Sequence, residues 1–251
     1  MSGHSKWHNI KIRKGAQDAK RGKLFAKLSR EIMVAASQGG SDSSMNVRLK
    51  TAIEKAKEVS MPVANIDRAV KKGSGELDGG NQLVEVVYEG YGPGGVALII
   101  ETMTDNRNRT AGEVRSTLTK HGGNLGEAGC VAWMFEQKGI ILLEPGSADT
   151  EEVMLAAIEC GAEDVTEDGD TIEIQTDPQQ LYLVRTALEE AGYKIQDASL
   201  TMIPKNVVPL DLERARKTLN LMELLEDLED VSNVYANFDI PDELMQELQS
   251  E

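Results

Sequence analysis

Cations are concentrated near the N-terminus of this chain, where they could bind phosphate groups. The first thirty residues contain nine Lys or Arg and a single acid, Asp18. Extending the count to Lys72 gives 16 basic and 6 acidic residues, which leaves 11 basic and 36 acidic residues for the rest. The formal charge of −15 therefore combines a segment of +10 with one of −25. A polyanion such as DNA or RNA would be attracted to the first segment and repelled by the second.

The candidates for nucleic-acid contact fall in a short arm and in the helix that follows it. The arm, residues 3–10, combines positive charge with the aromatic ring of Trp7. Sites for single-stranded nucleic acid use such a combination, because bases stack on the ring while cations hold the backbone. Packing of Trp7 on a neighbouring helix is the alternative. We predict the following nucleic-acid-binding residues: Lys6, Trp7, Lys11, Arg13, Lys14, Lys20, Arg21, Lys23, Lys27 and Arg30.

Four of these cations would form a stripe on one helix. On a helix over residues 16–37, Lys20, Lys23, Lys27 and Arg30 share an arc that is separate from the apolar arc. A solvated face usually mixes charge signs, so this arrangement favours phosphate contact. If about five cations neutralise phosphates, log affinity should fall with log salt at a slope of about −4 to −5. The competing interpretation is docking of the stripe onto the acidic C-terminal half, within one chain or between subunits.

A second cluster of polar residues, Thr104–Thr110, contains two arginines. Asp105 or Asn106 can cap a helix that begins here, which places Arg107 and Arg109 in its first turn. Cations there oppose the helix dipole, and a bound phosphate or carboxylate would relieve the penalty. The pattern predicts an anion site at both arginines. Ion pairs with strand acids such as Glu89 or Glu101 would explain them equally well.

Signatures of enzymes and metal sites are absent from the sequence. The glycine-rich run 90–95 lacks the GK[ST] continuation of a phosphate-binding loop, and neither GxSxG nor HExxH occurs. His4 and His8 are four residues apart, without a neighbouring Cys or carboxylate to complete a zinc site. We therefore expect no catalytic residues, no metal and no cofactor.

Composition indicates a cytoplasmic protein without a membrane partner. The longest strongly apolar run, Val96–Ile100, is far shorter than the roughly 20 residues of a membrane helix. The two cysteines, Cys130 and Cys160, lack CxxC spacing and are expected to be reduced.

Apolar periodicity predicts helices first and then a mixture of strands and helices. Helices are expected over residues 16–37, about 45–59, with Asp42, Ser43 or Ser44 as cap, and 62–73. Strands are expected at 83–89 and 96–103, a helix at 107–121 and a strand at 131–136. The order strand 139–143, helix 150–160, strands 163–166 and 171–176, helix 178–191, strand 194–203 is that of a ferredoxin-like unit. A helix at 212–228 and a strand at 231–238 follow.

The last helix and strand are too few to form a domain, but they would complete the interrupted sheet of residues 82–136. The predicted fold class is therefore α+β multidomain. It comprises an N-terminal three-helix bundle (1–78), a discontinuous α+β domain (79–137 and 206–251), and a ferredoxin-like domain (138–205) inserted into it.

Several long runs resemble the YebC family, and they occur in the same order as in that family. They are residues 3–7 (GHSKW), 18–23 (DAKRGK), 30–32 (REI), 88–93 (YEGYGP) and 104–110 (TDNRNRT). The Met-Ser-Gly start resembles bacterial members rather than the mitochondrial translational activator of cytochrome c oxidase.

The resemblance implies a helical domain followed by two α+β domains, one of them ferredoxin-like and inserted in the other. It also implies a function. Members are generally described as transcriptional regulators, and DNA binding is known for some of them, whereas others act in translation at the ribosome. We therefore predict a non-enzymatic, DNA-binding transcriptional regulator of the YebC type. The alternative is a ribosome-associated translation factor that binds ribosomal RNA. Either partner would bind through the basic N-terminal domain.

Overall fold

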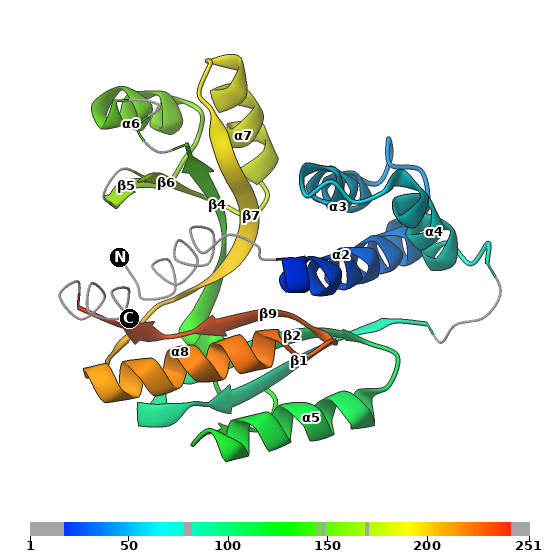
Figure 1. Cartoon of the computed structure of the whole chain (residues 1–251). Helices are drawn as coiled ribbons and strands as arrows, with labels where there is room; N and C mark the ends of the chain where they lie inside the picture. Colours follow the sequence, from blue (N-terminus) through cyan, green and yellow to red (C-terminus); the bar gives the residue numbers. More distant parts are fainter. Residues whose placement is uncertain (1–17, 78–81, 145, 147–148, 169–170, 242–251) are drawn as a thin grey trace.

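The computed structural model describes residues 18–77, 82–144, 146, 149–168 and 171–241. Three helices lie beside two four-stranded sheets, each of which carries two helices of its own (Figure 1). Below, we call these parts the helical domain, the middle domain and the ferredoxin-like domain. The predicted α+β fold class is confirmed.

The helical domain consists of α2 (Asp18–Gly39), α3 (Val47–Glu58) and α4 (Val63–Gly73). The three apolar stripes meet in one core that contains Ile32, Leu49 and Ile66. The cap of α3 is Asn46, whose side chain accepts the Leu49 backbone N–H, and the expected cap at residues 42–44 was wrong. The Asn46 amide also donates to the carbonyls of Ala35 and Gly40, which fixes the turn after α2.

Close packing of α4 on α2 depends on Gly73, the last residue of α4. A Cβ atom at this position would collide with the backbone carbonyl of Met33 on α2. The glycine therefore allows the two helices to approach, in addition to ending α4.

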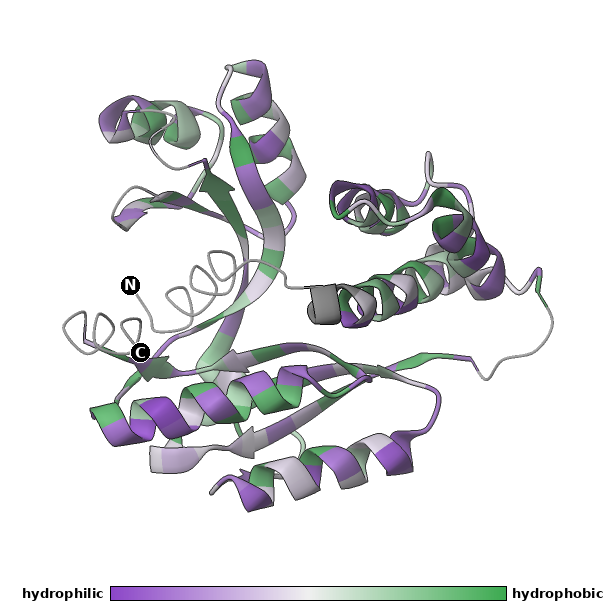
Figure 2. Ribbon diagram, viewed as in Figure 1, coloured by the Kyte–Doolittle hydropathy of each residue, from purple (hydrophilic) through white to green (hydrophobic). Residues whose placement is uncertain are grey.

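The middle domain is a sheet of order β3-β1-β2-β9, built from segments far apart in the sequence. Its strands are β1 (Val84–Tyr91), β2 (Ala97–Thr104), β3 (Asn124–Leu125) and β9 (Val231–Ala236). Helices α5 (Arg107–Lys120) and α8 (Leu212–Glu226) cover one face, where Leu98 and Ile100 pack on Val114 and Leu225. Hydrophobic and hydrophilic residues alternate along both helices, as expected when one face of a helix lies on a core (Figure 2).

A tight hairpin joins β1 to β2, as the glycine pattern predicted. The turn contains a short 3₁₀ helix, η1 (Pro93–Gly95), in which Gly94 and Gly95 have φ of 77° and 80°. This left-handed backbone conformation explains the two glycines without any phosphate-binding role.

A parallel two-stranded ribbon pairs β8 (Val208–Pro209) with β10 (Phe238–Asp239), in the C-terminal part of the chain.

The ferredoxin-like domain is a sheet of order β5-β6-β4-β7 with two helices. Its elements are β4 (Phe135–Leu143), α6 (Thr150–Glu159), β5 (Asp164–Asp168), β6 (Thr171–Thr176), α7 (Leu181–Glu190) and β7 (Ile195–Pro204). Residues such as Ile141, Ile174 and Leu188 form its core. Since β9 follows this unit in sequence and pairs with β2, the ferredoxin-like unit interrupts the middle domain.

One predicted strand, 131–136, was wrong. Residues Ala132–Met134 form a 3₁₀ turn, η2, and Phe135 already begins β4 of the ferredoxin-like sheet. The edge strand of the middle sheet is instead the short β3, which pairs with Gly90 and Tyr91. Val131 and Phe135 are nevertheless both apolar because they are buried together against Ile99, on the face of the middle sheet opposite α5 and α8.

Candidate nucleic-acid interface

The cationic face of α2 contacts residues 226–230, which we call the acidic turn. This segment runs from the last residue of α8 to the residue before β9. Lys23 Nζ lies 3.2 Å from the Asp227 carboxylate, and both side chains are about half exposed. Lys27 Nζ donates a hydrogen bond of 2.6 Å to the backbone carbonyl of Glu226, the last residue of α8. Two of the predicted phosphate-binding cations therefore bind oxygens of the protein itself.

Arg30 completes this contact one turn further along α2. Its guanidinium donates to both the backbone carbonyl and the carboxylate of Glu229, and it lies 3.5 Å from the Asp230 carboxylate. Only 15% of the Arg30 side chain is exposed, which is far less than for Lys23.

The acidic turn suits cations for two electrostatic reasons. The last carbonyls of a helix lack intrahelical donors and carry the negative end of the helix dipole. The carboxylates of Asp227, Glu229 and Asp230 add formal charge at the same place. This is the intramolecular docking onto the acidic half that the sequence left open, and nucleic-acid binding by the stripe stays a prediction.

The remaining predicted residues of the arm and of α2 are not described at side-chain level. Lys6, Trp7, Lys11, Arg13 and Lys14 lie outside the described residues. Lys20 and Arg21 belong to α2, of which only the backbone is described at these two positions.

Asp230 is the centre of a buried polar network in the middle domain. Its carboxylate is 2% exposed and accepts hydrogen bonds from Arg109 (2.6 Å), Thr110 (2.7 Å) and Thr104 (3.1 Å). Burial alone would raise the pKa of Asp230, but the hydrogen bonds from Arg109 and the two threonines outweigh it and lower the pKa. The carboxylate is therefore held ionised beside Arg30, which links the helical and middle domains.

The two arginines in the first turn of α5, Arg107 and Arg109, make different contacts. Arg109 binds Asp230 and, at 2.9 Å, Asp105. The attraction of Asp230, to which it donates a hydrogen bond, raises the pKa of Arg109 further. Arg107 is exposed, and its backbone carbonyl accepts a hydrogen bond of 3.0 Å from the Tyr88 hydroxyl. Asn106 caps α5 as predicted, accepting the Arg109 backbone N–H.

The protein's own Asp230 carboxylate thus occupies the N-terminal end of α5, where the sequence predicted an external anion. An anion site at Arg107 and Arg109 stays untested as a binding site for another molecule. The alternative prediction, that Arg107 and Arg109 pair with the strand acids Glu89 or Glu101, was wrong. Glu101 instead accepts hydrogen bonds from Asn233 (3.0 Å) and from Tyr235 (3.1 Å) on β9.

Glu89 has a structural role that sequence reasoning missed. Its buried carboxylate accepts the backbone N–H groups of Gly129, Val131 and Ala132 at 2.6–2.8 Å. Burial would raise the pKa of Glu89, and these three hydrogen bonds more than compensate and lower it. The side chain fixes the loop that leads from β3 into β4.

Helix α3 holds the helical domain against the other two domains. Arg48 pairs with Glu31 on α2 (2.8 Å) and with Glu85 on β1 (2.6 Å). Thr51 shares a hydrogen bond of 2.6 Å with the hydroxyl of Tyr182 on α7. The helical domain is therefore anchored at α2 and α3.

Five cations of the helical domain remain exposed on α3 and α4, and they have no ion pair with another described residue. They are Lys50, Lys57, Arg68, Lys71 and Lys72. Sequence reasoning did not select them because they are interspersed with acids.

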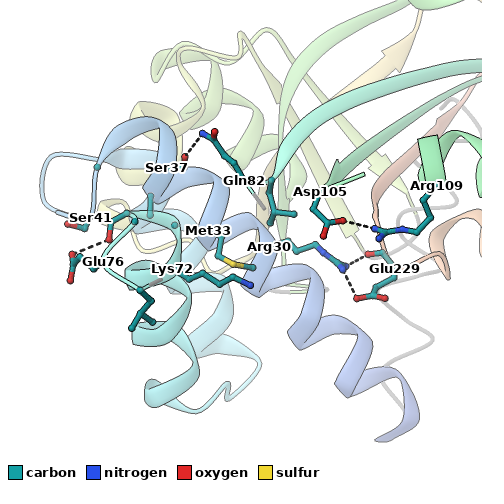
Figure 3. A pocket seen from close by; sticks show the side chains of 17 residues that line it. Arg30, Met33, Ser37, Ser41, Lys72, Glu76, Gln82, Asp105, Arg109 and Glu229 are labelled. Carbon is teal, nitrogen blue, oxygen red and sulfur yellow. Dashed lines mark hydrogen bonds and ion pairs between the residues drawn. The ribbon is translucent and has the colours of Figure 1, made fainter. Parts of the chain in front are cut away.

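A cavity of about 890 Å³ lies between the helical and middle domains (Figure 3). Arg30, Lys72 and Arg109 line it together with acids such as Asp105 and Glu229. The dashed contacts in Figure 3 show that Arg30 is bound to Glu229 and Arg109 to Asp105. The cavity wall is thus largely neutralised within the protein.

The residues that the structure describes contain neither a metal-binding cluster nor a membrane-spanning helix. No group of three or more His, Cys, Asp or Glu side chains there could hold a metal ion. No helix in the described ranges is long and apolar enough to cross a membrane.

Comparison with known proteins identifies the family. Residues 5–76 match the family model described as "TACO1/YebC protein N-terminal domain", and residues 83–238 match "TACO1/YebC second and third domain". Proteins from Dictyoglomus turgidum and Geobacter sulfurreducens are 56% and 55% identical over 249 and 248 residues, which is 99% of this chain and 100% of each relative. Both are named "Probable transcriptional regulatory protein".

A solved structure agrees with this assignment. The crystal structure of a conserved hypothetical protein from Aquifex aeolicus is similar to this chain, with a TM-score of 0.82 and 51% identity. The similarity covers 89% of this chain and 92% of that one. The resemblance inferred from the sequence is confirmed, and the chain belongs to the TACO1/YebC family.

Proposed function

We propose that this chain is a non-enzymatic regulator of transcription that binds nucleic acid through its helical domain and N-terminal arm. The names of its relatives support regulation of transcription. The observation that carries nucleic-acid binding is the charge separation, with +10 up to Lys72 and −25 beyond it. Phosphates supply much of the affinity of such complexes, and a segment this basic attracts them over long distances.

The exposed cations of α3 and α4 are our candidates for phosphate contact, in addition to the arm. Lys50 and Lys57 are seven residues apart and therefore share a face of α3. Arg68, Lys71 and Lys72 fall within the last turns of α4. Their guanidinium and ammonium groups are exposed and can reach a backbone without breaking an ion pair with a described residue.

Weak sequence preference is expected, because contacts with phosphate position a protein without reading bases. The same contacts would bind ribosomal RNA, so a ribosome-associated translation factor is the competing function. Positive charge alone does not distinguish DNA from ribosomal RNA, so the test compares both.

The test removes three exposed cations and measures binding by fluorescence anisotropy. Lys57→Gln, Arg68→Gln and Lys71→Gln are combined in one variant. The matched control removes three exposed cations elsewhere, in Arg115→Gln, Lys120→Gln and Lys194→Gln. The probes are a labelled DNA duplex of about two helical turns and an RNA hairpin of similar length.

If the three residues contact phosphates, the slope of log affinity against log salt should become less negative by up to about 3 on duplex DNA. Affinity at about 0.1 M salt should fall by about two orders of magnitude. The control variant should lose much less. Equal losses in both variants, or no binding by the wild-type protein, would contradict the proposal. Binding to RNA alone would favour the translation factor.

A further inference from the structure

We propose that the acidic turn competes with nucleic acid for the cationic face of α2, so that binding of a polyanion displaces this turn. The inference rests on the proposed function, and it adds a regulatory contact to it. It follows from the way in which Lys23, Lys27 and Arg30 are engaged within the chain.

The three cations contact one short segment. All three lie on one face of α2, and the contacts described above join each of them to residues 226–230. The partner atoms are two backbone carbonyl oxygens and three carboxylates, which resemble phosphate oxygens in accepting several charged donors.

The spacing of the cations also suits a nucleic-acid backbone. Residues 23 to 30 extend over about 10 Å of helix, at about 1.5 Å per residue. At about 3.4 Å per phosphate along one strand, this is the axial length of about three phosphates. The same donors can therefore bind the acidic turn or a strand, but not both at once.

Exposure indicates which contacts give way first. Lys23 and Asp227 are 56% and 51% exposed, and the Glu229 carboxylate is 76% exposed, so water and salt screen these ion pairs. Asp230, in contrast, is 2% exposed and belongs to the network of α5. Displacement is thus expected to release Asp227 and Glu229 while the Asp230 network stays intact.

The contact would set a threshold for binding. A ligand with few phosphates must compete with a partner that is always present at high local concentration. A long strand can first bind the exposed cations of α3 and α4 and the arm, and then replace the acidic turn on α2. Short oligonucleotides should therefore gain more from removal of the turn's charges than long ones.

The test weakens the acidic turn and measures affinity for the same DNA and RNA probes at about 0.1 M salt. The variant Asp227→Asn/Glu229→Gln removes two exposed charges of the turn. The control Glu159→Gln/Glu190→Gln removes two exposed charges of the ferredoxin-like domain, with the same change in net charge. Circular dichroism and urea denaturation confirm that each variant is folded.

We expect the turn variant to bind about three- to tenfold more tightly than the wild type, since two exposed ion pairs are removed. The control should change by less than about twofold, because distant exposed charges are screened. The gain should disappear when Lys23→Gln and Lys27→Gln are present, because the competing donors are then absent.

Two other results would overturn the inference. If the wild-type protein binds and both pairs of substitutions change affinity equally, the turn is no competitor, and the proposed function stands. If neither the wild type nor the turn variant binds either probe, the inference and the proposed function both fail.

Discussion

Replacing Asp230 by Asn is expected to destabilise the protein by about 3 kcal/mol, because the carboxylate is buried and accepts several hydrogen bonds. Thr110 and Thr104 donate to it at 2.7 and 3.1 Å. Hydrogen bonds to a charged group contribute about 1.5–3 kcal/mol each, and Asn retains one acceptor oxygen for them. Arg109 is 44% exposed, so water screens its ion pair and most of the expected loss comes from the two threonine hydrogen bonds.

The assay is urea denaturation followed by circular dichroism at neutral pH. Asp227→Asn is the matched control, because Asp227 is 51% exposed and its removal should change the free energy of unfolding by less than about 0.5 kcal/mol. An Asp230→Asn variant within about 0.5 kcal/mol of the wild type would refute the role assigned to the network.

The same substitution predicts a pH dependence. The pKa of Asp230 is lowered in the folded protein. Its contribution is therefore present above the unfolded pKa of about 3.9 and is lost as pH falls through the lower folded value. The difference in stability between wild type and Asp230→Asn should be constant from neutral pH to about pH 5 and shrink in stronger acid.

Further substitutions test the packing and polar contacts. Glu89→Gln should lower the free energy of unfolding by about 2 kcal/mol, since one of the two acceptor oxygens becomes a donor that faces backbone N–H groups. An unchanged midpoint of urea denaturation would contradict this prediction. Gly73→Ala should destabilise the protein by about 1–3 kcal/mol, because the added Cβ collides with α2. Gly22→Ala, which has open space around it, should stabilise the protein by about 0.5–1 kcal/mol. A lower melting temperature for Gly22→Ala than for Gly73→Ala would refute the close approach of α4 to α2. Arg48→Gln should cost about 1 kcal/mol, and a double-mutant cycle with Glu85→Gln should show coupling, which would be absent if the pair is only apparent.

Periodicity predicted most helices and strands, because apolar residues repeat wherever an element lies on a core. It failed at residues 131–136, where Val131 and Phe135 are buried although only Phe135 belongs to a strand. Residues 132–134 instead form a 3₁₀ turn, and Glu89 accepts the backbone N–H groups of Val131 and Ala132. The deciding contact is 42 residues away in sequence, so local pattern could not reveal it.

The candidate site was predictable in part. Net charge along the chain identified the basic segment, and the spacing on α2 identified its cationic face. The partners of that face could not be identified, because Glu226 is 199 residues from Lys27 and carries no signal that separates it from other acids. Arg109 and Asp230 are similarly 121 residues apart. Long-range ion pairs depend on the packed fold, which is why the exposed cations emerged only from the structure.

The proposed function requires that the helical domain and the N-terminal arm bind nucleic acid. Ultraviolet crosslinking in cells, followed by mass spectrometry of the crosslinked peptides and sequencing of the attached nucleic acid, tests it most directly. We predict that crosslinked peptides fall within residues 1–77, the segment that contains all 16 cations of the basic part of the chain. Crosslinks confined to the acidic domains, or no crosslinks to DNA or RNA at all, would contradict the account.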